Sequence, residues 1–233
     1  MSYDQLINEL RSVSEEKFAD FQRKLVPTKK EILGICTPKM RLLAKKWGKD
    51  FEKLFSFPDE YFEVAFIKSA ALASLPFDKY VVYVEKILGA FDNWAVCDCF
   101  KPKCVRMHKE EYLPYLKRFF ATEKEFFQRH VLVTLLFYYI EPAYFAEIES
   151  FLRQADTSKY YVHMAAAWLV AEILIKDYEE GKRLLSLRFL PQKTQDKAIQ
   201  KARESYRLTQ EQKEELKTLK IKKGSTNGHF TNA

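Results

Sequence analysis

The sequence predicts an all-α protein, and three observations support that prediction. Apolar residues recur with the helical period of 3.6 or fill continuous runs, and clean alternation of apolar and polar residues is almost absent. The segments between breaks are about 12–20 residues long, which is normal for helices and long for strands. Only 6 of the 233 residues are glycine, so tight turns are few. We expect about ten to twelve helices and no sheet.

Proline or capping residues mark the breaks between these segments. The clearest start is at Thr37 and Pro38, where threonine can cap a helix and proline suits its first turn, ahead of KMRLLAKKWGKDFEKLF. Thr209 predicts another capped start, ahead of a last charged helix. We expect a single repeat domain over residues 1–221 and a disordered polar tail over 222–233. Further breaks are expected at SFPDE, SLPFD, FKPK, TEKE, EPAY, QADTSK and LPQKTQ.

The composition narrows the class of partner. So few glycines disfavour the glycine-rich loops that hold nucleotide phosphates. A formal net charge of +7 and a pI near 9.0 fit a protein that binds nucleic acid or another anionic surface. A solvated lysine-rich surface would give the same charge. The N-terminus lacks an apolar signal region and no apolar run is long enough to span a bilayer, so we expect a cytoplasmic protein with no membrane partner.

Four cysteines raise the question of a metal site. Cys97, Cys99 and Cys104 lie close to His108 in sequence, which invites a zinc interpretation. Their spacing is not that of a standard zinc finger, and a helix would scatter the side chains around its axis. We expect free thiols, with Cys36 as the fourth, and no metal or other cofactor.

The stretch FDNWAVCDCF places Trp94 and Asp98 four residues apart. In a helix these positions share one face, so the indole and the carboxylate would meet the same target. A carboxylate in an apolar stretch is costly unless it is paired. Asp98 could therefore cap a neighbouring helix, bridge Lys101 or Lys103, or form half of a functional site, and Trp94 could equally be a core residue.

Unusual residues recur at intervals resembling those of helix-pair repeats. Trp94 and Arg129 are 35 residues apart, and Arg129 and Trp168 are 39 apart. HEAT and armadillo repeats are about 40–47 residues long, and equivalent positions of successive inner helices line one concave surface. The sequence therefore predicts that these residues converge with Asp98. Arg129 could also be a buried ion-pair partner of Glu125 or Asp98.

Five segments, in this order, resemble the AlkD-type DNA alkylation repair family of HEAT-like repeat DNA glycosylases, most closely its shorter members. They are GICTPKMRLLAKK, DNWAVCD, FFQRHVLV, YYVHMAAAWLVAEI and IQKARESYR, and the resemblance covers roughly residues 15–221. It implies a HEAT-like solenoid whose concave basic face cradles duplex DNA. The activity it implies is release of cationic N3- or N7-alkylpurines.

The resemblance also implies roles for individual residues. The family's W-x-x-x-D motif matches Trp94 and Asp98, its active-site arginine after glutamine matches Arg129, and its later tryptophan matches Trp168. One departure is Ala171, where the best-known type has a basic residue three positions after that tryptophan.

The chemistry fits these residue types. The two indole faces would hold the cationic lesion. Asp98 would stabilise the oxocarbenium-like sugar or orient a water, as carboxylates do in glycoside hydrolysis. Arg129 would keep Asp98 charged or clamp a phosphate. We expect a monomer that binds DNA phosphates through Arg41, Lys45 and Lys46 at one end and Lys197, Lys201 and Arg203 at the other.

Two other functions compete with this hypothesis. One is a DNA-binding protein without catalytic activity that recognises distorted or branched DNA. The other is a protein–protein adaptor, whose concave face would carry apolar patches and no converging basic residues. The histidines His108, His130 and His163 form no recognisable catalytic triad pattern, so we expect structural or surface roles for them.

Overall fold

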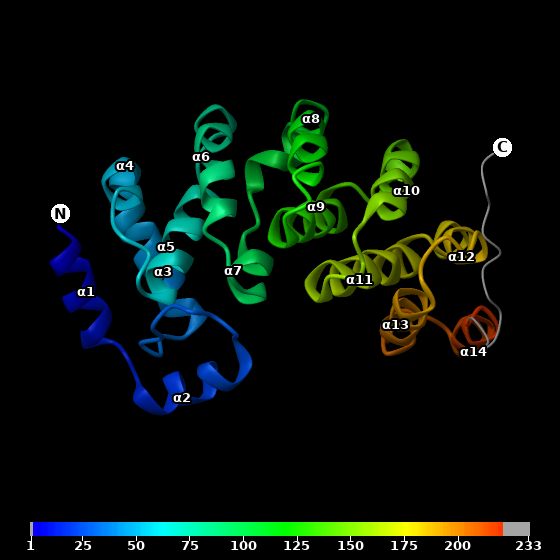
Figure 1. The fold of residues 1–233 in the computed structure, drawn as a ribbon, viewed down its shortest axis with the longest axis horizontal. Coiled ribbons are helices and arrows are strands. Elements are labelled where there is room, and N and C mark those ends of the chain that lie inside the picture. The colour runs from blue at the N-terminus through cyan, green and yellow to red at the C-terminus, as the bar shows by residue number, and fades with distance from the viewer. Residues whose placement is uncertain (1, 221–233) are drawn as a thin grey trace. The chain divides into compact units, whose positions relative to one another are not determined.

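The structure is a computed structural model that describes residues 2–220, and it confirms the all-α class (Figure 1). Over that range the only β pairing is one isolated parallel bridge between Glu31 and Tyr61. The expected tail over 222–233 lies outside the described residues. The α-helices run from α1 to α14, more than the ten to twelve expected, because several of the predicted segments are divided.

The chain forms two compact units, and the first spans residues 1–138. In this unit α5 is buried on nearly all sides, and α3, α4, α6 and α7 pack against it. The helix α9 packs against α6, α7 and α8. Its helices are α1 Tyr3–Ser12, α2 Glu16–Leu25, α3 Thr37–Trp47, η1 Gly48–Asp50, α4 Phe51–Phe55, α5 Phe62–Leu72, α6 Phe77–Gly89, α7 Trp94–Cys99, η2 Lys103–Met107, α8 Lys109–Phe120 and α9 Glu125–Tyr138 (Figure 1).

The second unit spans residues 139–233, of which the structure describes those up to 220. Its centre is α11, an apolar helix that packs against both α12 and α13. Gly181 permits the close approach of α12, because a Cβ there would lie 2.6 Å from Leu174. Its helices are η3 Pro142–Tyr144, α10 Phe145–Gln154, α11 Tyr160–Lys176, α12 Tyr178–Ser186, α13 Gln192–Arg203 and α14 Gln210–Thr218.

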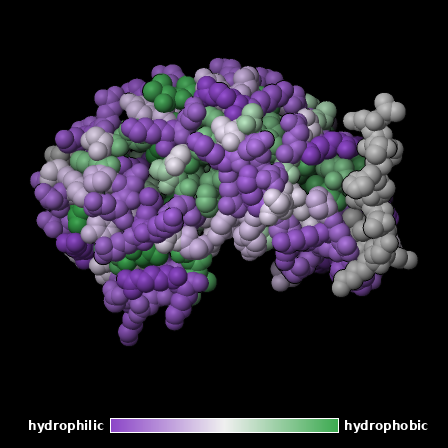
Figure 2. All heavy atoms as spheres, in the orientation of Figure 1, coloured by the Kyte–Doolittle hydropathy of each residue, from purple (hydrophilic) through white to green (hydrophobic). Residues whose placement is uncertain are grey.

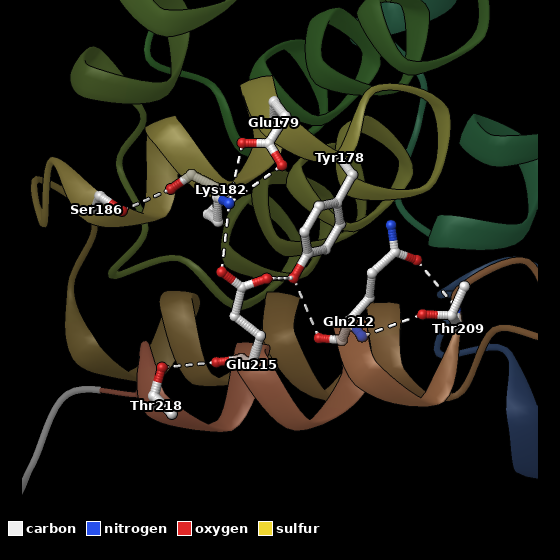
Figure 3. Close-up of polar contacts among 8 residues, drawn as sticks. All are labelled: Tyr178, Glu179, Lys182, Ser186, Thr209, Gln212, Glu215 and Thr218. Atoms are coloured by element: carbon white, nitrogen blue, oxygen red, sulfur yellow. Dashed lines mark hydrogen bonds and ion pairs between the residues drawn. The ribbon is translucent and has the colours of Figure 1, made fainter.

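Polar contacts join α12 to α14 in the second unit (Figure 3). The hydroxyl of Tyr178 donates to Glu215 at 2.7 Å, and Lys182 lies between Glu215 and Glu179. The expected cap at Thr209 is confirmed: its hydroxyl accepts from the backbone N–H of Gln212 at 3.2 Å. This capping box sets where the last described helix begins.

The segment after Thr37 differs in part from the prediction. Pro38 lies in the first turn of α3, as expected, but the helix already includes Thr37 and has no side-chain cap. The predicted continuous run to Phe55 is broken by the short turn η1, because the side chain of Asp50 caps the next helix through the backbone N–H of Lys53.

A buried carboxylate holds the loop between α2 and α3. Glu63 of α5 is fully buried and accepts from the backbone N–H groups of Leu33, Gly34 and Ile35, at 3.1, 2.9 and 3.4 Å. Burial raises the pKa of Glu63, and the three backbone donors oppose that rise. The loop is thereby fixed against α5, and its Gly34 carbonyl accepts from the backbone N–H of Glu15, directly before α2, at 3.0 Å.

Polar side chains cover most of the face shown in Figure 2, with apolar atoms visible between them. No helix within residues 2–220 is both long enough and apolar enough to cross a bilayer.

Gly34 is required for the loop conformation, and we predict that Gly34→Ala destabilises the fold by about 2 kcal/mol or more. Gly34 has a φ of +88°, and a Cβ there would lie 2.4 Å from the carbonyl oxygen of Glu15. The control is Gly89→Ala, because no heavy atom lies within 4 Å of a Cβ at that position. Urea unfolding should show a loss for the first variant only; equal midpoints would refute the packing argument.

Candidate functional site

The short helix α7 carries both residues of the W-x-x-x-D motif, Trp94 and Asp98. Six residues are too few for a helix that is stable alone. The fully buried Asn93 caps it, its Oδ1 accepting from the backbone N–H of Val96 at 3.0 Å, while Val96 and Cys97 are buried beneath it. Tertiary contacts therefore fix the direction in which Trp94 and Asp98 point.

Asp92 connects α7 to the loop that follows α2. One carboxylate oxygen accepts from the hydroxyl of Thr28 at 2.7 Å and from the backbone N–H of Lys29 at 3.1 Å. The other accepts from the side-chain amide of Asn93 at 2.7 Å. This connection was not predicted from the sequence, although an Asp-Asn pair directly before a helix is a signal for capping.

Asp98 forms a two-point ion pair with Arg129 of α9. The Nε of Arg129 donates to Oδ1 at 2.8 Å, and its Nη2 donates to Oδ2 at 2.6 Å. The side chain of Arg129 is 6% exposed and that of Asp98 is 18% exposed. Of the partners considered for Asp98, the structure shows Arg129, and the remaining exposure of the carboxylate leaves it accessible to a ligand.

Trp94 lies on the same face of α7, one turn before Asp98. The residue is 37% exposed, and its Nε1 donates to the backbone carbonyl of Leu25 at 3.2 Å. The hydrogen bond fixes the orientation of the indole, and the exposed part of the ring remains open to solvent. An oriented carboxylate and an exposed aromatic surface thus occupy neighbouring positions.

The cysteines near the site are free thiols, as expected. Burial raises the pKa of Cys97, and burial also raises that of Cys99 although the nearby Arg41 lowers it. Both thiols are therefore neutral at neutral pH. Across the described part of the chain, His, Cys, Asp and Glu side chains form no group of three or more that could hold a metal ion.

Trp168 lies in α11 of the second unit and is half-buried. The three recurrent residues Trp94, Arg129 and Trp168 therefore fall on α7, α9 and α11, alternate helices of the chain. Convergence of Trp168 with the other two stays a prediction. Ala171 is 2% exposed, so its side chain faces the core of the second unit.

Two of the three predicted DNA-binding residues near the N-terminus lie in one hollow. Arg41 and Lys45 are exposed and line a hollow of about 740 Å³ in the first unit. Lys46 belongs to a different contact, an ion pair with Glu9 at 2.6 Å. The hollow also contains three cations that were not predicted from the sequence to bind DNA: Lys49, Lys101 and Lys103.

The second predicted group lies on α13 of the second unit. Lys197 lines a smaller hollow of about 340 Å³ together with Lys193, Lys220 and His163. Lys201 and Arg203 are half-buried on the same helix. Their part in DNA binding stays a prediction.

The histidines have the structural surroundings expected for them. His130 is fully buried, with Tyr112 and Thr134 within 3.4 Å of its Nε2. His163 is buried, and its Nδ1 lies 2.9 Å from the hydroxyl of Thr194. His108 stacks on a phenylalanine ring and pairs with a glutamate at its helix start.

These features define an all-helical repeat protein in which a short capped helix presents a paired carboxylate and an exposed indole. The chain belongs to the DNA alkylation repair enzyme family, whose family model matches residues 6–208. The protein is thus assigned to DNA alkylation repair. No curated protein matches the chain at a significant level.

A double-mutant cycle should show that Asp98 and Arg129 depend on each other. We predict that Asp98→Asn and Arg129→Gln each cost about 2–4 kcal/mol in the free energy of unfolding, because each leaves the other partner buried without its countercharge. The double variant should lose about 1–3 kcal/mol less than the sum. Urea unfolding of the four proteins measures this coupling, and strictly additive losses would contradict it.

The buried imidazole should make stability depend on pH. Burial lowers the pKa of His130 from 6.5 to about 3. Between these values the unfolded chain binds a proton that the folded chain does not, so stability falls as pH falls below 6.5. We predict that, from pH 7.5 to 5, the wild type loses about 2 kcal/mol more than His130→Gln. Parallel stability curves for the two proteins would refute this.

Proposed function

We propose that the protein is a DNA glycosylase that hydrolyses the N-glycosidic bond of cationic N3- or N7-alkylpurines in duplex DNA. The observation that carries the proposal is the pair of side chains on α7. Asp98 is oriented by two hydrogen bonds from Arg129, and Trp94 is exposed on the same face. A carboxylate and an indole face are both suited to a positively charged ligand.

The proposed substrate makes a modest demand on the protein. An N3- or N7-alkylpurine is positively charged and leaves as a neutral base, so positive charge passes to the sugar as the bond breaks. The protein must hold the lesion and stabilise that charge, and a water then adds at the anomeric carbon and loses a proton to solvent. Neither step requires a metal or an organic cofactor.

Asp98 stabilises the developing sugar cation in this mechanism, and Arg129 acts as a positioning residue. The guanidinium of Arg129 repels the sugar cation, so the net electrostatic effect depends on the distances of the two side chains from that cation. With an effective dielectric constant of about 20, a carboxylate at about 3.5 Å attracts by about 5 kcal/mol and a guanidinium at about 6 Å repels by about 3 kcal/mol. A net effect of about 2 kcal/mol favours the transition state.

Trp94 holds the cationic base through its ring face. A cation over an indole gains about 0.5–2 kcal/mol, depending on how far water is removed. The hydrogen bond from Trp94 to Leu25 keeps the ring from turning away. Trp168 is the second aromatic surface in the proposal, and this role requires that it meet the same nucleotide.

The ion pair also favours a second candidate function, DNA binding without catalysis. A guanidinium that neutralises the carboxylate is a common structural arrangement in a protein interior. In this alternative the same surface recognises distorted or branched DNA, and Asp98 only stabilises the fold. The two functions differ in what Asp98→Asn does to base release.

Base release tests the proposal directly. Purified protein is incubated with duplex DNA containing 7-methylguanine or 3-methyladenine, and free base is measured under single-turnover conditions. We predict release above the spontaneous rate and a loss of about 30-fold in Asp98→Asn, which corresponds to about 2 kcal/mol of transition-state stabilisation. Asp78→Asn, an exposed carboxylate on α6, is the matched control and should keep the wild-type rate.

Both variants are assayed at a temperature where their unfolding curves show folded protein. Tight DNA binding without release of either base would defeat the glycosylase proposal and favour the binding function. Release at the wild-type rate by folded Asp98→Asn would remove Asp98 from the mechanism.

A further inference from the structure

A cationic hollow in the first unit is lined by Cys99 of α7 but by neither Asp98 nor Trp94 of the candidate site. It measures about 740 Å³, and its lining includes five cations and no carboxylate. The cations come from two separate parts of the sequence: Arg41, Lys45 and Lys49 from α3 and η1, and Lys101 and Lys103 from the segment after α7.

The five cations are exposed, and none forms an ion pair with a carboxylate of residues 2–220. Two have other contacts: Lys101 lies 4.0 Å from the ring centre of Phe137, and Arg41 lies against the thiol of Cys99. Neither contact neutralises charge. No carboxylate within residues 2–220 therefore offsets the positive charge of the hollow.

Helix ends account for only part of this charge. The lining includes residues at the C-terminal ends of α3, α5, α7 and α9, where the negative end of the helix dipole attracts cations. Each end is equivalent to about −0.5 charge, so four ends offset about two of the five positive charges. About three remain, enough to balance up to three phosphodiesters.

The arrangement of the cations favours a strand over a compact anion. Arg41 and Lys45 are four residues apart on one face of α3, with a rise of about 6 Å between them, and Lys49 follows in η1. Successive phosphates of a nucleic-acid strand are also a row of single charges. Tyr138 also lines the hollow, and burial raises its pKa, so its hydroxyl stays neutral and can donate to a phosphate.

The hollow begins next to the candidate site. Cys99 lines it and directly follows Asp98 at the end of α7. We infer that the hollow binds two or three successive phosphates of the DNA strand beside the damaged nucleotide, so that binding depends on the backbone on one side of the lesion. This inference rests on the proposed function, because that function identifies the bound strand as damaged DNA.

The salt dependence of DNA binding tests the inference without catalysis. The hollow variant is Lys45→Gln/Lys49→Gln, and the matched control is Lys53→Gln/Lys79→Gln, which removes two exposed lysines from α4 and α6. Anisotropy titrations with an undamaged duplex give the slope of log affinity against log salt. Each lost phosphate contact lowers the slope by about 0.9, so we expect a decrease of about 2 for the hollow variant and little change for the control. Equal changes in both would overturn the inference.

A second measurement locates the phosphates. A duplex carrying one 2′-fluoro-7-methylguanine, which resists cleavage, is prepared with one neutral methylphosphonate at each linkage in turn. The wild type should lose affinity at two or three consecutive linkages on one side of the lesion, and the hollow variant should lose nothing further there. Equal losses at every linkage, or the same losses in the hollow variant, would overturn the assignment.

Inorganic tripolyphosphate distinguishes a strand from a free polyphosphate. It should displace the duplex only weakly at matched ionic strength, and stronger binding than the duplex would show that the hollow is built for a compact anion. None of these readouts uses base release. If the protein binds DNA but has no glycosylase activity, the hollow variant should still show the lower salt slope. If the protein is an active glycosylase and the hollow variant has an unchanged salt slope, the phosphate-binding inference fails and the proposed function stands.

Discussion

The pair between Asp98 and Arg129 is the interaction on which the geometry of the candidate site depends. It is largely buried and joins a six-residue helix to the long helix α9. A buried ion pair is weak evidence of stabilisation, because desolvation opposes its attraction. Here the ion pair orients the carboxylate, because two hydrogen bonds from Arg129 hold it in one orientation. The cap from Asn93 and the three donors to Asp92 hold the other end of the same helix, so α7 is fixed at both ends.

The all-α class followed from periodicity, because helices of this length repeat their apolar positions several times. The boundaries were less predictable. The run after Pro38 read as one helix, yet it divides at η1, where a single capping interaction from Asp50 is more favourable than continuing. Glu63 shows another limit. A carboxylate in an apolar helix indicates that it has a buried partner. Here the partners are backbone N–H groups of a distant loop. Every residue type except proline has such a group, so these partners could not be predicted from the sequence.

At the site, the helical spacing of Trp94 and Asp98 was readable because both residues lie on one element. The partner of Asp98 was one of several possibilities, since 31 residues separate it from Arg129 and only tertiary packing decides among the candidates. Only part of the hollow could be predicted from the sequence. Arg41 and Lys45 lie on a predicted helix, whereas Lys101 and Lys103 occupy a segment whose position depends on how α7 and η2 pack. Lys46, adjacent to Lys45, points instead to Glu9.

Under the proposed function, the hydrogen bond from Trp94 to Leu25 has a consequence for selectivity. An indole has one polar atom, its N–H, and here the backbone accepts it. What remains of Trp94 for a ligand is a ring face, which responds to charge and flatness and is indifferent to the pattern of donors and acceptors on a base edge. A surface of this kind distinguishes cationic bases from neutral ones more readily than adenine from guanine. Discrimination between purines would have to come from other groups that contact the base edge.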